Sequence, residues 1–134
     1  MSEAEIEILK PVYAEWSQGN FRPVTDAYGA DLEWGWSEEF PDIAGMAPGA
    51  EGRDERLLSW LSSWDHWQVE AEEYLTAGET VLVMCRYTGR GKGSGVSVDT
   101  EGAHLWTIRD GRATRLIVFS DRDRALEAAG LSGR

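Results

Sequence analysis

The 134-residue sequence is poor in several residue types, and each shortage narrows what the protein can be. Its single cysteine, Cys85, cannot form a disulfide within the chain, which is consistent with a reducing compartment. The two histidines, His66 and His104, lie far apart, and no histidine, cysteine or carboxylate shows zinc-site spacing. We therefore expect no metal, and a buried apolar role for Cys85 rather than a nucleophilic one.

Basic residues are also scarce, since 13 Lys and Arg face 24 Asp and Glu, a net charge of −11. Affinity for nucleic acids comes mainly from Lys and Arg that neutralise phosphates, so this charge argues against a nucleic-acid partner. No run of about 18 apolar residues is present to span a membrane. The acidic first residues lack the basic-then-apolar order of a secretory signal. We expect a cytoplasmic protein without a membrane partner.

The length fits one domain, 1–134, that is large enough to bury a core and keep a small-molecule cavity. Over residues 3–18, apolar side chains recur at the spacing of a helix packed on a core, and Gly19 is a suitable end for that helix. Pro11 interrupts the pattern, so we expect a kink there or a helix that begins nearer Pro11. A second short helix is expected at about 22–28.

The middle of the chain changes character twice. Alternating apolar and polar residues in DLEWGW, 31–36, predict a half-buried strand. Residues 37–52 mix turn formers with acids and predict a long loop, of the kind that often acts as a lid. From about Arg53 the apolar positions return to helical spacing. Three tryptophans would form a stripe on this helix: Trp60, Trp64 and Trp67.

From Val69 onward the apolar period becomes two, which predicts strands separated by glycine-containing turns. The four expected strands are 69–78, 79–91, 95–110 and 112–121. Asp110 and Gly111 form a strong hairpin signal because both residues tolerate positive φ. A short helix follows, with Asp121 or Asp123 as its cap. Helices grouped early and an antiparallel meander late predict an α+β fold with the helices on one face of the sheet.

Four segments, taken in order, resemble a known family: VYAEWSQGN at 12–20, GADLEWGW at 29–36, EGRDERLLSWLSSW at 51–64 and HLWTIRDGRATRLIVFSDRDRALEAAGL at 104–131. With them the chain is similar, over essentially its full length, to the SnoaL-like branch of the nuclear transport factor 2-like superfamily. The resemblance implies a cone-shaped, curved antiparallel sheet wrapped around helices, a deep apolar pocket, and a homodimer formed through the convex sheet face. It does not select a reaction, because that fold hosts ketosteroid isomerases, polyketide cyclases, dehydratases and epoxide hydrolases.

The resemblance also implies positions for the catalytic groups. The isomerase base falls on Trp36, whose indole is no base, so that chemistry is not expected. Tyr13 lies one residue from the family's tyrosine, and His104 takes the place of the oxyanion-hole acid. The Asp-Arg-Asp network of the epoxide hydrolases has no counterpart, since no expected strand has an Arg-x-Asp pair. The carboxylate of the cyclases lies on the last strand, where Asp121 is the nearest match and capping the last helix is the alternative.

The Asp-Gly turn predicts which side chains of the last two strands share a face. Pairing counted back from Arg109 and Arg112 sets His104 opposite Ile117. One face would then hold His104, Trp106, Ile108, Ile117, Phe119 and, at its edge, Asp121. A histidine titrates near pH 6.5 when unperturbed, so His104 in such a wall suits proton transfer near neutrality, with a purely structural role as the alternative.

Together these patterns predict a cofactor-free pocket protein for a mostly apolar, ring-containing or polyketide-like metabolite. His104 and Asp121 are the candidate acid/base groups of a cyclase, isomerase or dehydratase-type reaction. The candidate substrate-binding residues are Tyr13, Trp34, Trp36, Trp106, Phe119 and Arg86. Two other classes stay open: a non-catalytic ligand-binding module, and a structural dimerisation domain whose seven tryptophans fill the cavity.

Overall fold

The described elements form one six-stranded sheet with a helix on each side. The computed structural model describes residues 2–19, 32–37, 45–46 and 61–131. Their elements are α1 (Ser2–Trp16), β1 (Glu33–Trp36), β2 (Gly45–Met46), β3 (Trp64–Ala77), β4 (Thr80–Gly91), β5 (Ser97–Arg109), β6 (Arg112–Phe119) and α3 (Arg122–Ala128). The strands lie in the order β2-β1-β6-β5-β4-β3. The predicted α+β class is confirmed.

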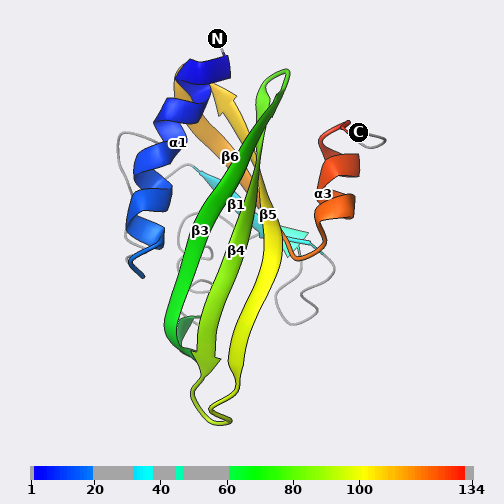
Figure 1. Ribbon diagram of the computed structural model, residues 1–134. Helices are drawn as coiled ribbons and strands as arrows, with labels where there is room; N and C mark the ends of the chain where they lie inside the picture. The colour runs from blue at the N-terminus through cyan, green and yellow to red at the C-terminus, as the bar shows by residue number, and fades with distance from the viewer. Residues whose placement is uncertain (1, 20–31, 38–44, 47–60, 132–134) are drawn as a thin grey trace.

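The four long strands β3 to β6 form an antiparallel meander, and Figure 1 shows them twisting into a curved sheet. β1 pairs with β6 in parallel, so the expected purely antiparallel sheet is mixed instead. A tight hairpin imposes antiparallel pairing, whereas β1 meets β6 from a distant part of the sequence. The helices were expected on one face of the sheet, but α1 and α3 pack on opposite faces. The face packed on α1 is called the inner face below, and the face packed on α3 the outer face.

Helix α1 begins at Ser2 and contains Pro11, so the predicted start nearer Pro11 is wrong. Pro11 has no N–H to donate to the carbonyl one turn earlier in the helix. Because the proline is exposed, this carbonyl lies on the solvent side, where water can donate to it instead. The helix ends as expected, because Gly19 has a φ of 82° and its N–H donates to the carbonyl of Trp16. The side chains of α1 that enter the core are Leu9, Val12, Tyr13 and Trp16.

The expected tryptophan stripe does not continue along a helix, since Trp64 and Trp67 belong to β3. A spacing of three residues is typical of a helix, but here it occurs in a strand. Pairing with β4 is interrupted between Asp65 and Gln68, where His66 has a φ of 58°. The two indole rings lie 5.0 Å apart between centroids. A local irregularity of the strand thus produced the helical period.

Three expected segments lie largely or wholly outside the described residues: the short helix at 22–28, the helical stretch at 53–60 and the loop at 37–52. Within the last of these, Gly45–Met46 forms β2, which pairs with β1. The loop prediction therefore missed a short strand that extends the sheet by one member.

The β5–β6 hairpin has the predicted turn and a shifted register. Asp110 and Gly111 have φ values of 51° and 76°, and Arg109 pairs with Arg112. The pairing then shifts between Thr107 and Ile108, so His104 lies opposite Val118 rather than Ile117. Because strand side chains alternate, this one-residue shift exchanges the two faces of β6 relative to β5.

With this register, the buried apolar side chains form two clusters, one on each face of the sheet. The inner cluster contains the buried side chains of α1 with those of β1 and with Val69, Val81, Val83, Cys85, Tyr87, Trp106, Ile108, Ala113, Leu116 and Val118. The outer cluster contains Leu82, Met84, Ala103, Leu105, Phe119 and Ala125. Helix α3 thus covers part of the face that was expected to receive a second subunit.

Candidate functional site

A buried hydrogen-bonded relay joins α1 to β5 on the inner face. The indole Nε1 of Trp106 donates to the hydroxyl oxygen of Tyr13 at 2.7 Å, and this oxygen lies 2.6 Å from Nδ1 of His104. Donation of the Tyr13 proton to Nδ1 gives the hydroxyl proton an acceptor and Nδ1 a donor, and on that basis we assign His104 the tautomer with its proton on Nε2. His104 and Trp106 share a face because alternate residues of a strand do.

Burial keeps this relay uncharged. His104 is 3% exposed, and desolvation lowers its pKa to about 3. Burial likewise raises the pKa of Tyr13 well above its usual value of 10, with a smaller contribution from Cys85. His104 is therefore neutral at neutral pH, which argues against the proton transfer near neutrality that was expected of it. A neutral imidazole in this position is a poor base and a good hydrogen-bond donor through Nε2.

Aromatic rings surround the relay in a continuous layer. Trp16 lies 5.6 Å from His104 and 5.6 Å from Trp34 between ring centroids. Trp34 lies 5.9 Å from Trp36, and Tyr87 lies 5.7 Å from His104. We call the following set the aromatic layer: Tyr13, Trp16, Trp34, Trp36, Tyr87, His104 and Trp106. It brings together four of the predicted wall residues, which are Tyr13, Trp34, Trp36 and Trp106.

Three predicted site residues do not join the layer, namely Phe119, Asp121 and Arg86. Phe119 belongs to the outer cluster, because the register shift turns its side chain away from His104. Asp121 is exposed, and its Oδ1 accepts from the backbone N–H groups of Asp123 at 2.9 Å and Arg124 at 3.4 Å. Its carboxylate therefore caps α3, which was the alternative role expected for it.

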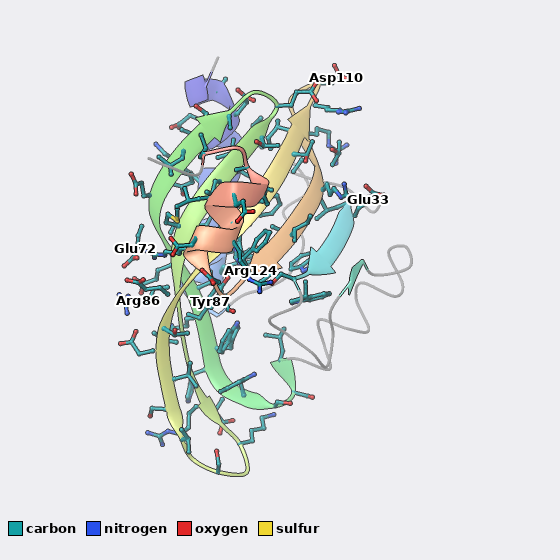
Figure 2. The ribbon with its side chains drawn as sticks, turned by 90° about the vertical axis from the view of Figure 1, so that its right-hand side faces the viewer. Glu33, Glu72, Arg86, Tyr87, Asp110 and Arg124 are labelled. Atoms are coloured by element: carbon teal, nitrogen blue, oxygen red, sulfur yellow. The ribbon has the colours of Figure 1, made fainter. Side chains whose placement is uncertain are left out.

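Arg86 also lies away from the layer, within an ionic network on the outer face. Its guanidinium donates to Asp99 at 2.7 Å and to Glu72 at 3.3 Å. Glu72 also accepts from Arg122 at 2.6 Å, and Figure 2 shows Glu72 and Arg86 side by side on this surface. Hydrogen bonds from Arg122 and Arg86 lower the pKa of Glu72, while Asp99 and Glu72 raise that of Arg86. These acidic partners already bind the Arg86 guanidinium, so the structure places this candidate substrate-binding residue in an ionic network away from the aromatic layer.

Sequence reasoning missed Tyr87 as a member of the layer. Its hydroxyl donates to the carbonyl of Phe119 at 2.8 Å, and its ring covers the backbone at Gly102. A Cβ on Gly102 would lie 2.1 Å from a ring atom of Tyr87. Two signals were available: Tyr87 has the phase of the inward residues of its strand, and a glycine inside a strand marks close approach of another group.

A surface hollow of about 340 Å³ opens where the end of α1 meets the beginning of β3. Its lining consists of Gln18, Gly19, Leu61, Trp64, His66, Trp67 and Gln68. Trp67 stacks on Tyr87 at 5.8 Å, and Tyr87 contacts His104, so a row of rings joins the hollow to the relay. The volume falls in the range of small-molecule sites.

Within the described residues, no group of three or more His, Cys, Asp or Glu is arranged to hold a metal ion. Neither described helix is both long and apolar enough to cross a membrane.

Comparison with known proteins places the chain in a family. The model of the SnoaL-like domain matches residues 10–116, and the chain belongs to that family. Three solved structures of 19–22% sequence identity share the fold. TerC, co-crystallised with polyporic acid, is 22% identical with a TM-score of 0.74, over 95% of this chain and 98% of that one.

The other two structures extend the same likeness. A Jannaschia sp. CCS1 protein assigned to the SnoaL-like polyketide cyclases is 19% identical with a TM-score of 0.75, over 99% of this chain and 95% of that one. A ketosteroid isomerase-like protein of Catenulispora acidiphila DSM 44928, in complex with trimethylamine, is 20% identical with a TM-score of 0.69, over 93% of each chain. No curated protein matches the sequence significantly.

Proposed function

We propose that the protein binds a mostly apolar, ring-containing or polyketide-like small molecule against the aromatic layer, with His104 as the polar anchor. The observation that supports this best is the relay from Trp106 through Tyr13 to His104, which orients a neutral imidazole inside apolar surroundings. Membership of the SnoaL-like family supports a small-molecule pocket in the same fold. Homodimer formation and a cytoplasmic location stay predictions.

The chemistry that this arrangement favours is stabilisation of an oxygen anion. A neutral Nε2–H donates to a carbonyl oxygen and binds it more strongly as negative charge develops during enolate formation. This is the electrostatic part of a cofactor-independent cyclase, isomerase or dehydratase-type reaction. With a pKa of about 3, His104 does not supply the base for such a reaction near neutral pH.

A second candidate is a non-catalytic ligand-binding module. Among the described residues no carboxylate is buried, so none of them stands beside His104 as a buried base. Such a module would bind the same compounds and return them unchanged. Turnover of a bound compound therefore separates the two candidates.

The test is a binding titration, by tryptophan fluorescence and equilibrium dialysis, with polyporic acid and a panel of polycyclic, terpenoid and polyketide-like compounds. We expect saturable binding that Tyr13→Phe and His104→Gln weaken, and product formation from a bound compound would support the enzyme. Tyr74→Phe is the matched control, because the ring centroid of Tyr74 lies 6.2 Å from that of Tyr13 and Tyr74 is not part of the relay. Absence of saturable binding across the panel would refute the pocket.

A further inference from the structure

Trp34 has an indole N–H without a hydrogen-bond acceptor in the described part of the chain. The residue is 5% exposed and its Nε1 is buried. By contrast, the Nε1 of Trp106 donates to Tyr13. Buried donors are almost always paired in folded proteins, because leaving one unpaired after removing it from water costs free energy. Within the layer proposed to bind the ligand, a buried and unused donor is matched by an acceptor on that ligand.

The aromatic layer offers hydrogen-bond donors but no buried carboxylate of the described residues. Trp34 provides an N–H, and the relay leaves a second N–H on Nε2 of His104. No carboxylate is buried among the described residues to accept from, or neutralise, a basic ligand. A layer that offers donors and lacks anions matches ligands with carbonyl or enolate oxygens, and it disfavours amines and pure hydrocarbons.

We propose that Trp34 is a specificity-determining residue whose Nε1–H donates to a carbonyl or enolate oxygen of the ligand. This inference rests on the proposed binding function and names its ligand class, which is polycyclic ketones and related oxygenated ring compounds. The Trp16 ring neighbours both donor residues, with its centroid 5.6 Å from that of Trp34 and 5.6 Å from that of His104.

Trp36 provides the matched control. It lies on the same strand and the same face as Trp34, is also 5% exposed, and belongs to the same cluster. Its Nε1 is not among the buried groups that lack a partner. Replacing either tryptophan by phenylalanine removes similar ring area, whereas replacing Trp34 alone removes the unused donor.

The experiment compares 9-fluorenone with fluorene, which share a ring skeleton and differ by the carbonyl oxygen. Dissociation constants are measured by equilibrium dialysis, because the variants alter fluorescence. We expect the wild-type protein to prefer fluorenone, and Trp34→Phe to weaken fluorenone binding by roughly two- to tenfold while fluorene binding changes little. Trp36→Phe removes a ring of the same layer, so we expect it to weaken both compounds alike and to keep the ratio of their dissociation constants. Circular dichroism and thermal unfolding establish that each variant is folded.

A second measurement uses the wild-type protein, so it does not depend on whether a variant folds. In the wild-type protein, the ¹H–¹⁵N resonance of the Trp34 indole should shift downfield with fluorenone and not with fluorene. Equal binding of both compounds to the wild type, an unmoved resonance, or a fluorenone preference that survives Trp34→Phe would overturn the role of Trp34. If neither compound nor any member of the wider panel binds, the proposed function fails instead, so the two failures are distinguishable.

Discussion

On the inner face of the sheet His104 is buried, neutral and hydrogen-bonded to Tyr13, whereas on the outer face Arg86 and Glu72 are exposed and paired by charge. Both faces belong to the same strands and contain apolar clusters of their own. The difference follows from water, because an apolar layer excludes charge while a wet surface screens it.

The contrast indicates which polar groups are sensitive to substitution. In the inner relay each partner depends on the next, since removal of the Tyr13 hydroxyl takes away the acceptor that Nε1 of Trp106 uses and the group bonded to Nδ1 of His104. In the outer network the charges remain solvated when a partner is lost. We therefore expect large, salt-independent effects inside and small, salt-dependent effects outside.

The largest expected effect is the acid sensitivity contributed by His104. The unfolded chain protonates this residue near pH 6.5, whereas the folded protein does so only near pH 3. The unfolded state thus binds more protons in this window, and the free energy of unfolding falls as pH decreases through it. Between pH 6 and pH 4 we expect a loss of roughly 2 to 3 kcal/mol in the free energy of unfolding from this group, measured by urea unfolding.

The control for this prediction is His104→Gln, whose amide can still accept from Tyr13 but does not titrate. Glu72 and other surface carboxylates act equally in both proteins, so the difference between the two pH profiles isolates His104. Tyr13 and Tyr87 stay uncharged in this range, because burial raises both pKa values. Parallel profiles for the two proteins would show that His104 is not held neutral by burial.

The next effect concerns the close approach of Tyr87 to the backbone at Gly102. In Gly102→Ala the new methyl would overlap the tyrosine ring, which must move and weaken its bond to Phe119. We expect a loss of about 2 kcal/mol in the free energy of unfolding. Gly93→Ala is the matched control, since nothing lies within 4 Å of its added Cβ. Equal stability of the two variants would contradict the packing described for Tyr87.

The smallest effect is expected on the outer face, from Arg86→Gln. The guanidinium is partly exposed and its acidic partners are more so, hence its loss should change stability little and not at all in high salt. Arg122→Gln should cost more, because Arg122 also donates to the backbone carbonyls of Cys85 and Gly102. A large, salt-independent loss in the free energy of unfolding of Arg86→Gln would contradict the difference between the two faces.

Much of the fold followed from local patterns. The period of two after Val69 predicted the meander, and the Asp110–Gly111 pair predicted its last turn, because both signals depend on neighbouring residues. The helical spacing of α1 and the cap at Asp121 are equally local. These features need no knowledge of distant contacts.

The candidate site was harder to predict, because it depends on register. A single irregularity beside Ile108 moved Phe119 to the outer face, and another near His66 made a strand resemble a helix. Such irregularities arise where two strands adjust to each other, so neither strand's sequence reveals them. The pKa of His104 was likewise beyond prediction, since it depends on burial by side chains from other elements.

The sequence by itself determined the class of the fold, the order of the strands after Val69, and the kinds of residue available for a site. Only the tertiary structure decided which of them meet: Tyr13 with His104 and Trp106 inside, and Arg86 with Glu72 outside. Local propensity depends on neighbours in the chain, whereas burial, hydrogen-bond partners and charge state depend on residues that only folding brings together.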